Sequence, residues 1–320
     1  MTEKKRLIII DGNALIHRAY HALPLLKTKK GELVNAVYGF LLVFLKAIRE
    51  FQPNYIAAAF DIPKPTFRHK EFKEYKIKRP PTPKELSEQI PKIKEILKEF
   101  GVPTFEKEGF EADDIIGTIA HLAPKRQVIP AAKGEPRPLG REIETIILSG
   151  DLDTLQLINR NTKVYTPKKG LKDTVLYDEE MVKKRYEIRP SQLVDFRALR
   201  GDPSDNIPGV TGIGEKTAIH LLKDFGSLNN IYQEIEEKTE KSKKIKPAIR
   251  EKLLQYKEQA FFSKRLSEIK KDVPIDFNLE KCSFQEYNKE RVVQVFKKIE
   301  FYSLINRLPS TERSKSYRLF

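Results

Sequence analysis

The fold class is first indicated near the N-terminus by Lys5-Arg-Leu-Ile-Ile-Ile-Asp-Gly-Asn13. An aliphatic run closed by Asp-Gly-Asn is typical of a short buried strand that ends in a turn. Residues 55–60 (YIAAAF) and 144–148 (ETIIL) have the same character, and a shorter strand is predicted at 102–105. These runs predict a sheet whose central strands are buried.

Helical signals fill the intervals between these strands. Apolar residues recur at helical spacing over 33–50 and 115–122, which predicts two helices packed on the sheet. A third helix is predicted to begin at Thr82-Pro83-Lys84-Glu85, with Thr82 as its cap, and to run unbroken to Phe100-Gly101. Alternating strands and helices indicate an α/β fold with a mostly parallel, Rossmann-like central sheet.

The chain changes character after Pro190, where the strand signal fades. Further helices are predicted there at about 218–225, 246–264 and 289–305. We therefore expect an α/β domain over 1–189, a helical domain over 190–306 and a basic tail over 307–320. The first domain is expected to carry a basic helical arch over 62–100 and an inserted basic loop over 124–142.

Composition narrows the class of protein. Of 320 residues, 60 are Lys or Arg and 45 are Asp or Glu, and the resulting charge of +15 favours a polyanionic partner. The single cysteine, Cys282, excludes an internal disulfide and a multi-cysteine zinc site. The longest apolar run, 36–45, has ten residues, whereas a membrane-spanning helix needs about 20. No secretory signal is recognisable, so a cytoplasmic protein is expected.

Acidic residues collect at the predicted strand ends. Asp11, Asp61 and Asp151 each follow a buried strand. The carboxyl ends of parallel strands lie along one edge of a sheet, where α/β proteins bind ligands. The nine carboxylates predicted to converge there are Asp11, Asp61, Glu111, Asp113, Asp114, Asp151, Asp153, Asp202 and Asp205.

Two explanations of these acids stand side by side. An aspartate between a strand and a helix is often only a helix cap or a turn former, and for any single residue this is the stronger explanation. Converging carboxylates, however, repel one another and lose their charge unless cations hold them. Carboxylate oxygens suit Mg²⁺ or Mn²⁺, and two such ions can activate a water for phosphodiester hydrolysis.

A glycine-studded hairpin, residues 209–217 (GVTGIGEKT), precedes one of the predicted helices. Glu215 stands where a P-loop needs lysine, and Thr217 stands where a dinucleotide fingerprint needs glycine. A helix-hairpin-helix explains the segment better, because its amides and the start of its second helix can meet a DNA phosphate. The alternative is a tight turn without a ligand. The residues assigned to the phosphate contact are Gly209, Gly212, Gly214, Lys216 and Thr217.

The segment over residues 64–83 holds seven Lys or Arg against two Glu, with Phe67, Phe72 and Tyr75 among them. Basic side chains interleaved with aromatic rings suit single-stranded or frayed nucleic acid. A solvated charged surface is the usual explanation of such a run. The position directly after Asp61 favours the functional explanation, because it places the segment over the acidic edge.

Six motifs follow one another in a diagnostic order. They are Asp11-Gly-Asn13, Phe67-Arg-His69, Tyr75-Lys76, Glu111-Ala-Asp-Asp114, Asp151-Leu-Asp153 and Gly201-Asp-Pro-Ser-Asp-Asn-Ile-Pro-Gly209. In this order, and over residues 6–306, the chain resembles the 5′→3′ exonuclease domain of bacterial DNA polymerase I, which is flap-endonuclease-like and PIN-related. The resemblance implies a structure-selective 5′ nuclease of replication and repair that hydrolyses DNA and RNA-primer phosphodiesters at flaps, nicks and 5′ ends.

The resemblance also implies roles for single residues. Asp11, Asp61, Glu111, Asp113 and Asp114 would form a first metal cluster, and Asp151, Asp153, Asp202 and Asp205 a second, with Asp11, Asp114 and Asp151 counted as catalytic. Lys76 would stabilise charge on the scissile phosphate, with Arg79 assisting. Arg68 and Tyr75 would contact the threaded 5′ strand, and the remaining implied DNA contacts are Arg18, Tyr20, Lys78 and the hairpin, the last with a bound K⁺.

Three departures from the family pattern put substrate preference in question. Leu152 stands where lysine is usual, His17 stands where tyrosine is common, and the loop over 124–142 is longer than usual. No polymerase sequence follows, so we expect a nuclease that is free-standing or encoded apart from its polymerase. A monomer associated with the nucleoid is also expected. A non-catalytic DNA-binding scaffold and a PIN-type ribonuclease are the alternatives; the nine carboxylates speak against the first and the hairpin against the second.

Overall fold

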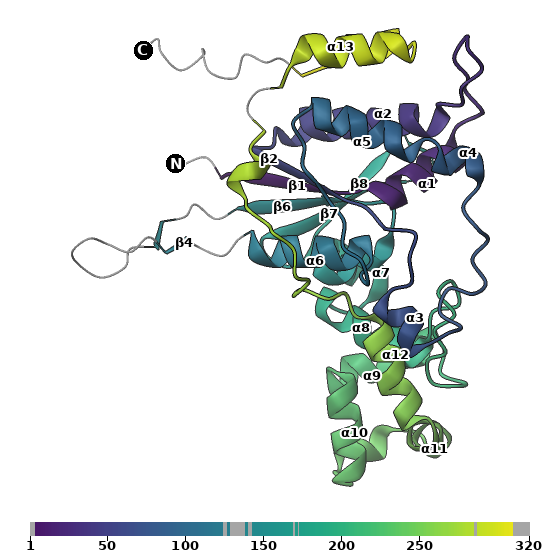
Figure 1. Cartoon of the computed structure of the whole chain (residues 1–320). Coiled ribbons are helices and arrows are strands. Elements are labelled where there is room, and N and C mark those ends of the chain that lie inside the picture. The colour runs from purple at the N-terminus through teal and green to yellow at the C-terminus, as the bar shows by residue number, and fades with distance from the viewer. Residues whose placement is uncertain are drawn as a thin grey trace.

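A six-stranded sheet with the order β3-β2-β1-β6-β7-β8 forms the centre of the molecule (Figure 1). The computed structural model describes residues 4–123, 127–128, 138–139, 143–168, 170–171, 173–284 and 287–309. The strands are β1 (Arg6–Asp11), β2 (Tyr55–Ala59), β3 (Thr104–Phe105), β6 (Glu144–Leu148), β7 (Thr162–Pro167) and β8 (Thr174–Tyr177). All neighbours pair in parallel except β7 with β8. The predicted mostly parallel sheet is confirmed, whereas β7 and β8 are not among the predicted strands.

Helices cover both faces of the sheet (Figure 1). One layer holds α1 (Gly12–Ala22), α2 (Asn35–Phe51), α5 (Ile90–Glu99) and α13 (Lys289–Lys298), and the other holds α6 (Ala112–Leu122) and α7 (Glu179–Tyr186). Successive side chains of a strand point to opposite faces. Ile8 and Ile10 of β1 accordingly pack in the first layer, and Leu7 and Ile9 pack in the second. Burial on both faces explains the unbroken aliphatic runs of the sequence.

Five helices form a lobe beside the sheet (Figure 1). They are α8 (Leu193–Arg200), α9 (Glu215–Phe225), α10 (Leu228–Glu236), α11 (Pro247–Gln255) and α12 (Lys257–Ser267). The helix predicted over 246–264 is thus two helices with Tyr256 between them. No helix in the described part of the chain is long and apolar enough to cross a membrane.

The chain returns from the lobe to the sheet. After α12 it runs past β2, where the amide of Phe284 donates to the carbonyl of Asn54 (2.7 Å). Val292 and Phe296 of α13 then join the apolar cluster of α2 and α5. Residues 289–305, predicted as one helix of the helical domain, are α13 and the short α14 (Tyr302–Ile305), and both pack in the α/β layer.

The helix predicted from Thr82 to Phe100 is divided. Thr82 does not cap it; α4 (Lys84–Ser87) begins after Pro83 without a side-chain cap. A second helix, α5, begins at Ile90 with Pro91 in its first turn, and a proline cannot donate the amide that a continuous helix needs there. The buried Gln89 side chain between the two accepts hydrogen bonds from the amides of Ala36 (2.9 Å) and Val37 (3.3 Å). Gln89 therefore caps α2, a contact that no local pattern predicts.

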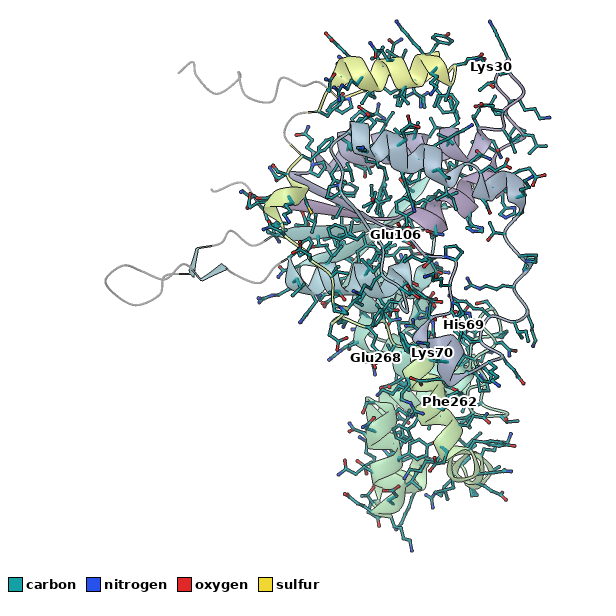
Figure 2. The ribbon with its side chains drawn as sticks, viewed as in Figure 1. Lys30, His69, Lys70, Glu106, Phe262 and Glu268 are labelled. Atoms are coloured by element: carbon teal, nitrogen blue, oxygen red, sulfur yellow. The ribbon has the colours of Figure 1, made fainter. Side chains whose placement is uncertain are left out.

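The basic arch predicted over 62–100 is helical in three separate pieces, α3 (Phe67–Glu71), α4 and α5. Between α3 and α4, residues 72–83 contain neither helix nor strand, with turns over 73–78. The base of the segment is anchored on the lobe: the rings of Phe72 and Phe262 pack edge to face at 5.5 Å. Figure 2 labels His69 and Lys70 of α3 close to Phe262. Most of the predicted inserted loop and residues 310–320 of the predicted tail lie outside the described residues, apart from a short antiparallel pair, β4 (Gln127–Val128) with β5 (Pro138–Leu139).

Candidate active site

A cavity of about 740 Å³ opens at the carboxyl edge of the sheet. Three adjacent strands, β2, β1 and β6, run toward this edge. Asp61, Asp11 and Asp151 follow or end these strands, and α6 brings two more acids to the same place. The predicted carboxylates in the cavity wall are Asp11, Asp61, Glu111, Asp113 and Asp151.

Two of these aspartates also cap helical turns. Asp11 accepts a hydrogen bond from the amide of Ala14 (3.0 Å), and Asp151 accepts one from the amide of Asp153 (2.9 Å). The Ser149 hydroxyl links the two, because it donates to Asp11 (2.6 Å) and accepts from the amide of Asp151 (2.9 Å). The capping explanation and the site explanation therefore hold at the same residues: capping fixes the direction in which the acids face.

Burial and mutual repulsion raise the pKa of the cavity acids. Burial raises the pKa of Asp11 to about 7, with Asp151 and Asp61 adding to the rise and the Ser149 bond opposing it. The pKa of Asp113 is raised well above its ordinary value, first by burial and then by Asp11, Asp151 and Asp153. The charged forms of these acids are therefore unfavourable until a cation neutralises them.

Other predicted carboxylates are held by basic side chains. The buried Asp114 bonds to both terminal nitrogens of Arg68 (2.7 and 2.9 Å) and also accepts the amide of Lys270 (2.9 Å). Asp205 pairs with Arg79, and Asp153 pairs with Arg197. Glu111 accepts from the ammonium group of Lys76 (2.8 Å).

Lys76 is held in an unusual backbone conformation. Its φ of 56° lies in the left-handed region. This conformation is energetically unfavourable for any residue other than glycine. The Lys76 amide donates to the carbonyl of Asp205 (2.9 Å), and the ammonium group lies 3.8 Å from the Asp205 carboxylate. The backbone strain thus aims this ammonium group at the acidic cavity, which Lys76 and Arg79 both line.

The structure corrects three of the predicted residue roles. Asp114 does not line the cavity, and its oxygens are occupied by Arg68 and backbone amides, so it is not available as a metal ligand. Arg68 and Tyr75 are 2% and 3% exposed, which leaves no surface for a threaded strand. Tyr75 instead donates to a Glu111 or an Asp205 oxygen, each 3.1 Å away. Arg68 and Tyr75 thus support the acids from behind.

The glycine hairpin is also corrected in part. Gly209 is buried, and its amide donates to the hydroxyl of Ser263 (3.0 Å) rather than facing solvent. Gly212 and Gly214 are exposed, and α9 begins directly after Gly214 with Lys216 in its first turn. The exposed part of the hairpin therefore begins after Gly209. The other predicted contacts differ in exposure: Lys78 is exposed, while Arg18, Tyr20 and Thr217 are half-buried.

Sequence reasoning missed two residues of the site. Ser149 directly follows β6, so its position two residues before Asp151 is a signal that was available. Arg197 lies on α8, more than 40 residues from its partner Asp153 in the chain. Only the packing of α8 against the site brings them together, and no local pattern marks Arg197.

The donor set of the cavity suits a hard divalent cation. As the side chains stand, no group of three or more His, Cys, Asp or Glu residues in the described part of the chain is arranged closely enough to hold a metal ion. Asp11, Asp61, Asp113 and Asp151 form no ion pair with Lys or Arg among the described residues. These four acids offer carboxylate oxygens, the ligands that Mg²⁺ and Mn²⁺ prefer, although Asn13, His17 and His21 also line the cavity.

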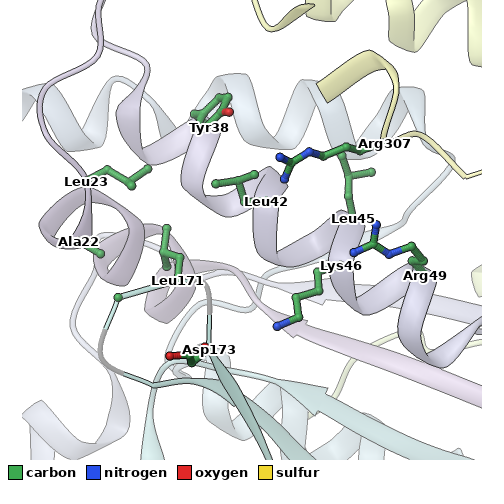
Figure 3. Close-up of a pocket in the computed structure, with 11 residues that line it drawn as sticks. Ala22, Leu23, Tyr38, Leu42, Leu45, Lys46, Arg49, Leu171, Asp173 and Arg307 are labelled. Atoms are coloured by element: carbon green, nitrogen blue, oxygen red, sulfur yellow. The ribbon is translucent and has the colours of Figure 1, made fainter. Parts of the chain in front are cut away.

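A second cavity, of about 750 Å³, has a different chemistry. Figure 3 shows its apolar lining, which includes Leu42 and Leu171, with Lys46, Arg49 and Arg307 around them. Asp173 is the one acid among its described lining residues. It has no set of groups suited to hydrolysis, so the acidic cavity is the candidate active site.

The sequence of the chain matches known family models and known proteins over most of its length. Residues 6–187 match a family model described as the 5′-3′ exonuclease, N-terminal resolvase-like domain, and residues 188–290 match the 5′-3′ exonuclease, C-terminal SAM fold. DNA polymerase I of Bacillus subtilis is 44% identical over 308 residues, and that of Caldicellulosiruptor bescii is 42% identical over 309. These alignments cover 96% of this chain but 33% and 34% of the relatives, so the chain spans about a third of their length.

Solved structures share the fold. The bacteriophage T5 5′-exonuclease with bound zinc has a TM-score of 0.61 at 22% identity, covering 83% of this chain and 90% of that chain. The bacteriophage T5 flap endonuclease, in a pseudo-enzyme–product complex with DNA and metal ions, has a TM-score of 0.62 at 19% identity. The second alignment covers 92% of this chain and all of the phage chain.

Proposed function

The chain belongs to the 5′-3′ exonuclease family, and from this we propose that it is a structure-selective 5′ nuclease that hydrolyses DNA, and RNA primers, at 5′ flaps, nicks and ends. The acidic cavity carries the proposal: five carboxylates line it, and the basic residues Arg18, Lys76 and Arg79 share its wall. Acids alone would repel a phosphodiester. Acids with bound cations, beside fixed positive side chains, would attract it and stabilise its reaction.

We assign the first metal ion to the acids that face the cavity, Asp11, Asp61 and Asp113, with Glu111 beside them. Asp151, which the resemblance places with the second ion, also lines this cavity and is reassigned to the first. Mg²⁺ or Mn²⁺ bound there would supply an activated water and neutralise developing charge on the phosphate. The raised pKa of Asp11 and of Asp113 agrees with this assignment, because burial and then the neighbouring acids make their charged forms unfavourable until a cation binds. Asp153, Asp202 and Asp205 are assigned to a second ion, and Asp114 to structural support.

Lys76 and Arg79 are proposed to act on the substrate phosphate. Their ion pairs with Glu111 and Asp205 hold them at the cavity wall before a substrate arrives. Positioned positive groups lower the barrier most where negative charge develops in the transition state. Lys76 is therefore assigned to the scissile phosphate and Arg79 to an assisting role.

The hairpin and the start of α9 are proposed to bind the backbone of the duplex. Gly212, Gly214 and Lys216 are exposed there, and a helix N-terminus favours a phosphate through its free amides and its dipole. We further propose that a K⁺ ion binds at this hairpin and that the two domains divide near residue 189. The protein is proposed to be a cytoplasmic, nucleoid-associated monomer whose partner is a separately encoded polymerase.

A 5′-labelled flap duplex tests the proposed function. With Mg²⁺ the protein should release the flap near its base, and with EDTA it should release nothing. Single-stranded RNA, assayed beside it, should be a poor substrate. Glu108→Gln is the matched control for variants of the cavity acids, because Glu108 is an exposed acid that pairs with Lys64 outside the cavity wall. Absence of cleavage with both Mg²⁺ and Mn²⁺ would refute the proposal.

A further inference from the structure

A largely buried arginine lies among the acids assigned to the second ion. Arg197 of α8 pairs with Asp153, and its Nε lies 3.9 Å from Oδ2 of Asp202. The Arg197 side chain is only 12% exposed. The other Asp202 oxygen accepts from the amide (2.9 Å) and the hydroxyl (2.6 Å) of Ser204, so Oδ2 is the oxygen left to face the guanidinium group.

The guanidinium group of Arg197 is held in place by the packing of α8 and by the neighbouring acids. α8 packs against α9 and α12, and it also contacts the turn over Leu152–Leu157 that contains Asp153. The buried Nη1 of Arg197 has no hydrogen-bond partner in the described part of the chain. A buried nitrogen without a partner costs free energy, so the packing of α8 and the attraction of the acids must hold Arg197 in place.

The two halves of the acidic edge therefore differ in their counter-charge. Asp11, Asp113 and Asp151 form no ion pair among the described residues, whereas Asp153 and Asp202 already have Arg197. A guanidinium group and a divalent cation compete for the same carboxylate oxygens, because both are attracted by the same negative charge. An ion that binds Asp153 and Asp202 must first displace Arg197.

We propose that Arg197 is the resident counter-cation of Asp153 and Asp202 and prevents these acids from holding a divalent ion in the substrate-free protein. The inference rests on the proposed function, since it concerns the second of the two proposed ions. Arg197 acts through the acids, so it is a positioning residue rather than a catalytic one. The free protein is thus a one-ion protein whose second position is occupied by a side chain.

Direct titration of the substrate-free protein with Mn²⁺, followed by electron paramagnetic resonance, tests this inference. Arg197→Met removes the charge and keeps a long apolar side chain, so it should gain a second ion with affinity increased about tenfold or more at that position. Arg197→Lys should keep the wild-type stoichiometry. Arg200→Met is the matched control, because Arg200 is an exposed residue of the same helix that pairs with Glu215 at 3.8 Å. Identical titrations of the wild type and Arg197→Met would overturn the inference.

A second comparison does not depend on the folding of an Arg197 variant. Because Arg197 pairs with Asp153, Asp153→Asn should change Mn²⁺ binding by the free protein less than about twofold, while Asp113→Asn should weaken it about tenfold or more. Equal losses in both variants would contradict the inference. Failure of the wild type to bind any Mn²⁺ would instead refute the proposed first metal site, so the two failures are distinguishable.

Discussion

Asp113 and Asp114 are neighbours in the sequence and lie in opposite environments. Both stand in the first turn of α6, where consecutive side chains point in directions about 100° apart. Asp113 faces the acidic cavity without a basic partner among the described residues, and Asp114 faces inward onto the two terminal nitrogens of Arg68. A single acidic motif therefore supplies one group that can meet a cation and one that ties the site to its support.

Loss of the cavity-facing acid Asp113 is expected to affect catalysis more than any other change. Asp113→Asn removes a proposed metal ligand that makes no capping bond, so single-turnover cleavage of a flap duplex should fall by about 1,000-fold. The free energy of unfolding, measured in urea with EDTA, should rise, because repulsion by Asp11 and Asp151 is relieved. A variant that cleaves at the wild-type rate would remove Asp113 from the site.

Loss of the inward-facing Asp114 is expected to lower the stability of the fold. Asp114→Asn leaves the buried Arg68 charge with Glu111, at 3.3 Å, as its remaining acidic partner, which should cost about 3 kcal/mol of unfolding free energy in urea. The double variant Arg68→Met/Asp114→Leu replaces the pair with apolar groups and should recover most of that loss. If the double variant is as unstable as the single one, the pair does more than neutralise its own charges.

Lys76 lines the same cavity as Asp113 but carries a positive charge, so its loss is expected to have a different effect. Lys76→Ala should slow single-turnover cleavage about 100-fold and change DNA affinity much less, since its proposed partner is charge in the transition state. Lys64→Ala is the matched control in the same basic segment, because Lys64 is exposed and pairs with Glu108. Weakened binding with an unchanged single-turnover rate would contradict the role.

The hairpin glycines make the same contrast on a smaller scale. Gly209 has a φ of +64°, and a Cβ placed there would lie 2.1 Å from the amide nitrogen of Gly201. Gly209→Ala should therefore lower the unfolding free energy by about 2 kcal/mol or more. A Cβ at Gly214 would meet no atom within 4 Å, so Gly214→Ala should keep its stability and affect only DNA affinity. Equal melting temperatures for the two variants would contradict the difference in packing.

The smallest effect is expected at Cys282, a buried group remote from the acids. Burial raises the pKa of its thiol to about 12, so at pH 8 the reactive thiolate is scarce. Alkylation by iodoacetamide, followed by mass spectrometry, should be slow in the folded protein and fast in urea, and Cys282→Ala should cleave flaps at the wild-type rate. Rapid alkylation of the folded protein would show that this thiol is accessible.

Much of the fold was predictable because its signals are local. The aliphatic runs at 6–11, 55–59 and 144–148 are strands, and their order places the following acids along one edge. The helix spacing of α2, α6 and α9 was equally readable. The break before Pro91 was missed because the buried Gln89 is used to cap α2, a partner more than 50 residues away.

The candidate site was predictable in its members but not in their surroundings. The motifs name all nine acids, yet only packing decides that Asp114 meets Arg68 or that Asp153 meets Arg197. Arg68 and Tyr75 belong to a basic, aromatic segment that resembles a nucleic-acid surface, and both are buried by contacts with the distant residues Leu266 and Asp205. Long-range burial of polar groups leaves no periodic trace in the sequence.

The return of the chain to the sheet after α12 has a mechanical consequence. The lobe of α8 to α12 is joined to the α/β layer by two chain connections. One lies near Pro190, and the other passes Asn54 to reach α13. A module held at two points resists rotation that a single tether would permit. If DNA binds at the hairpin as proposed, the two connections would keep it at a nearly constant distance from the acids, and the distance between hairpin and acids would set where the duplex is cut.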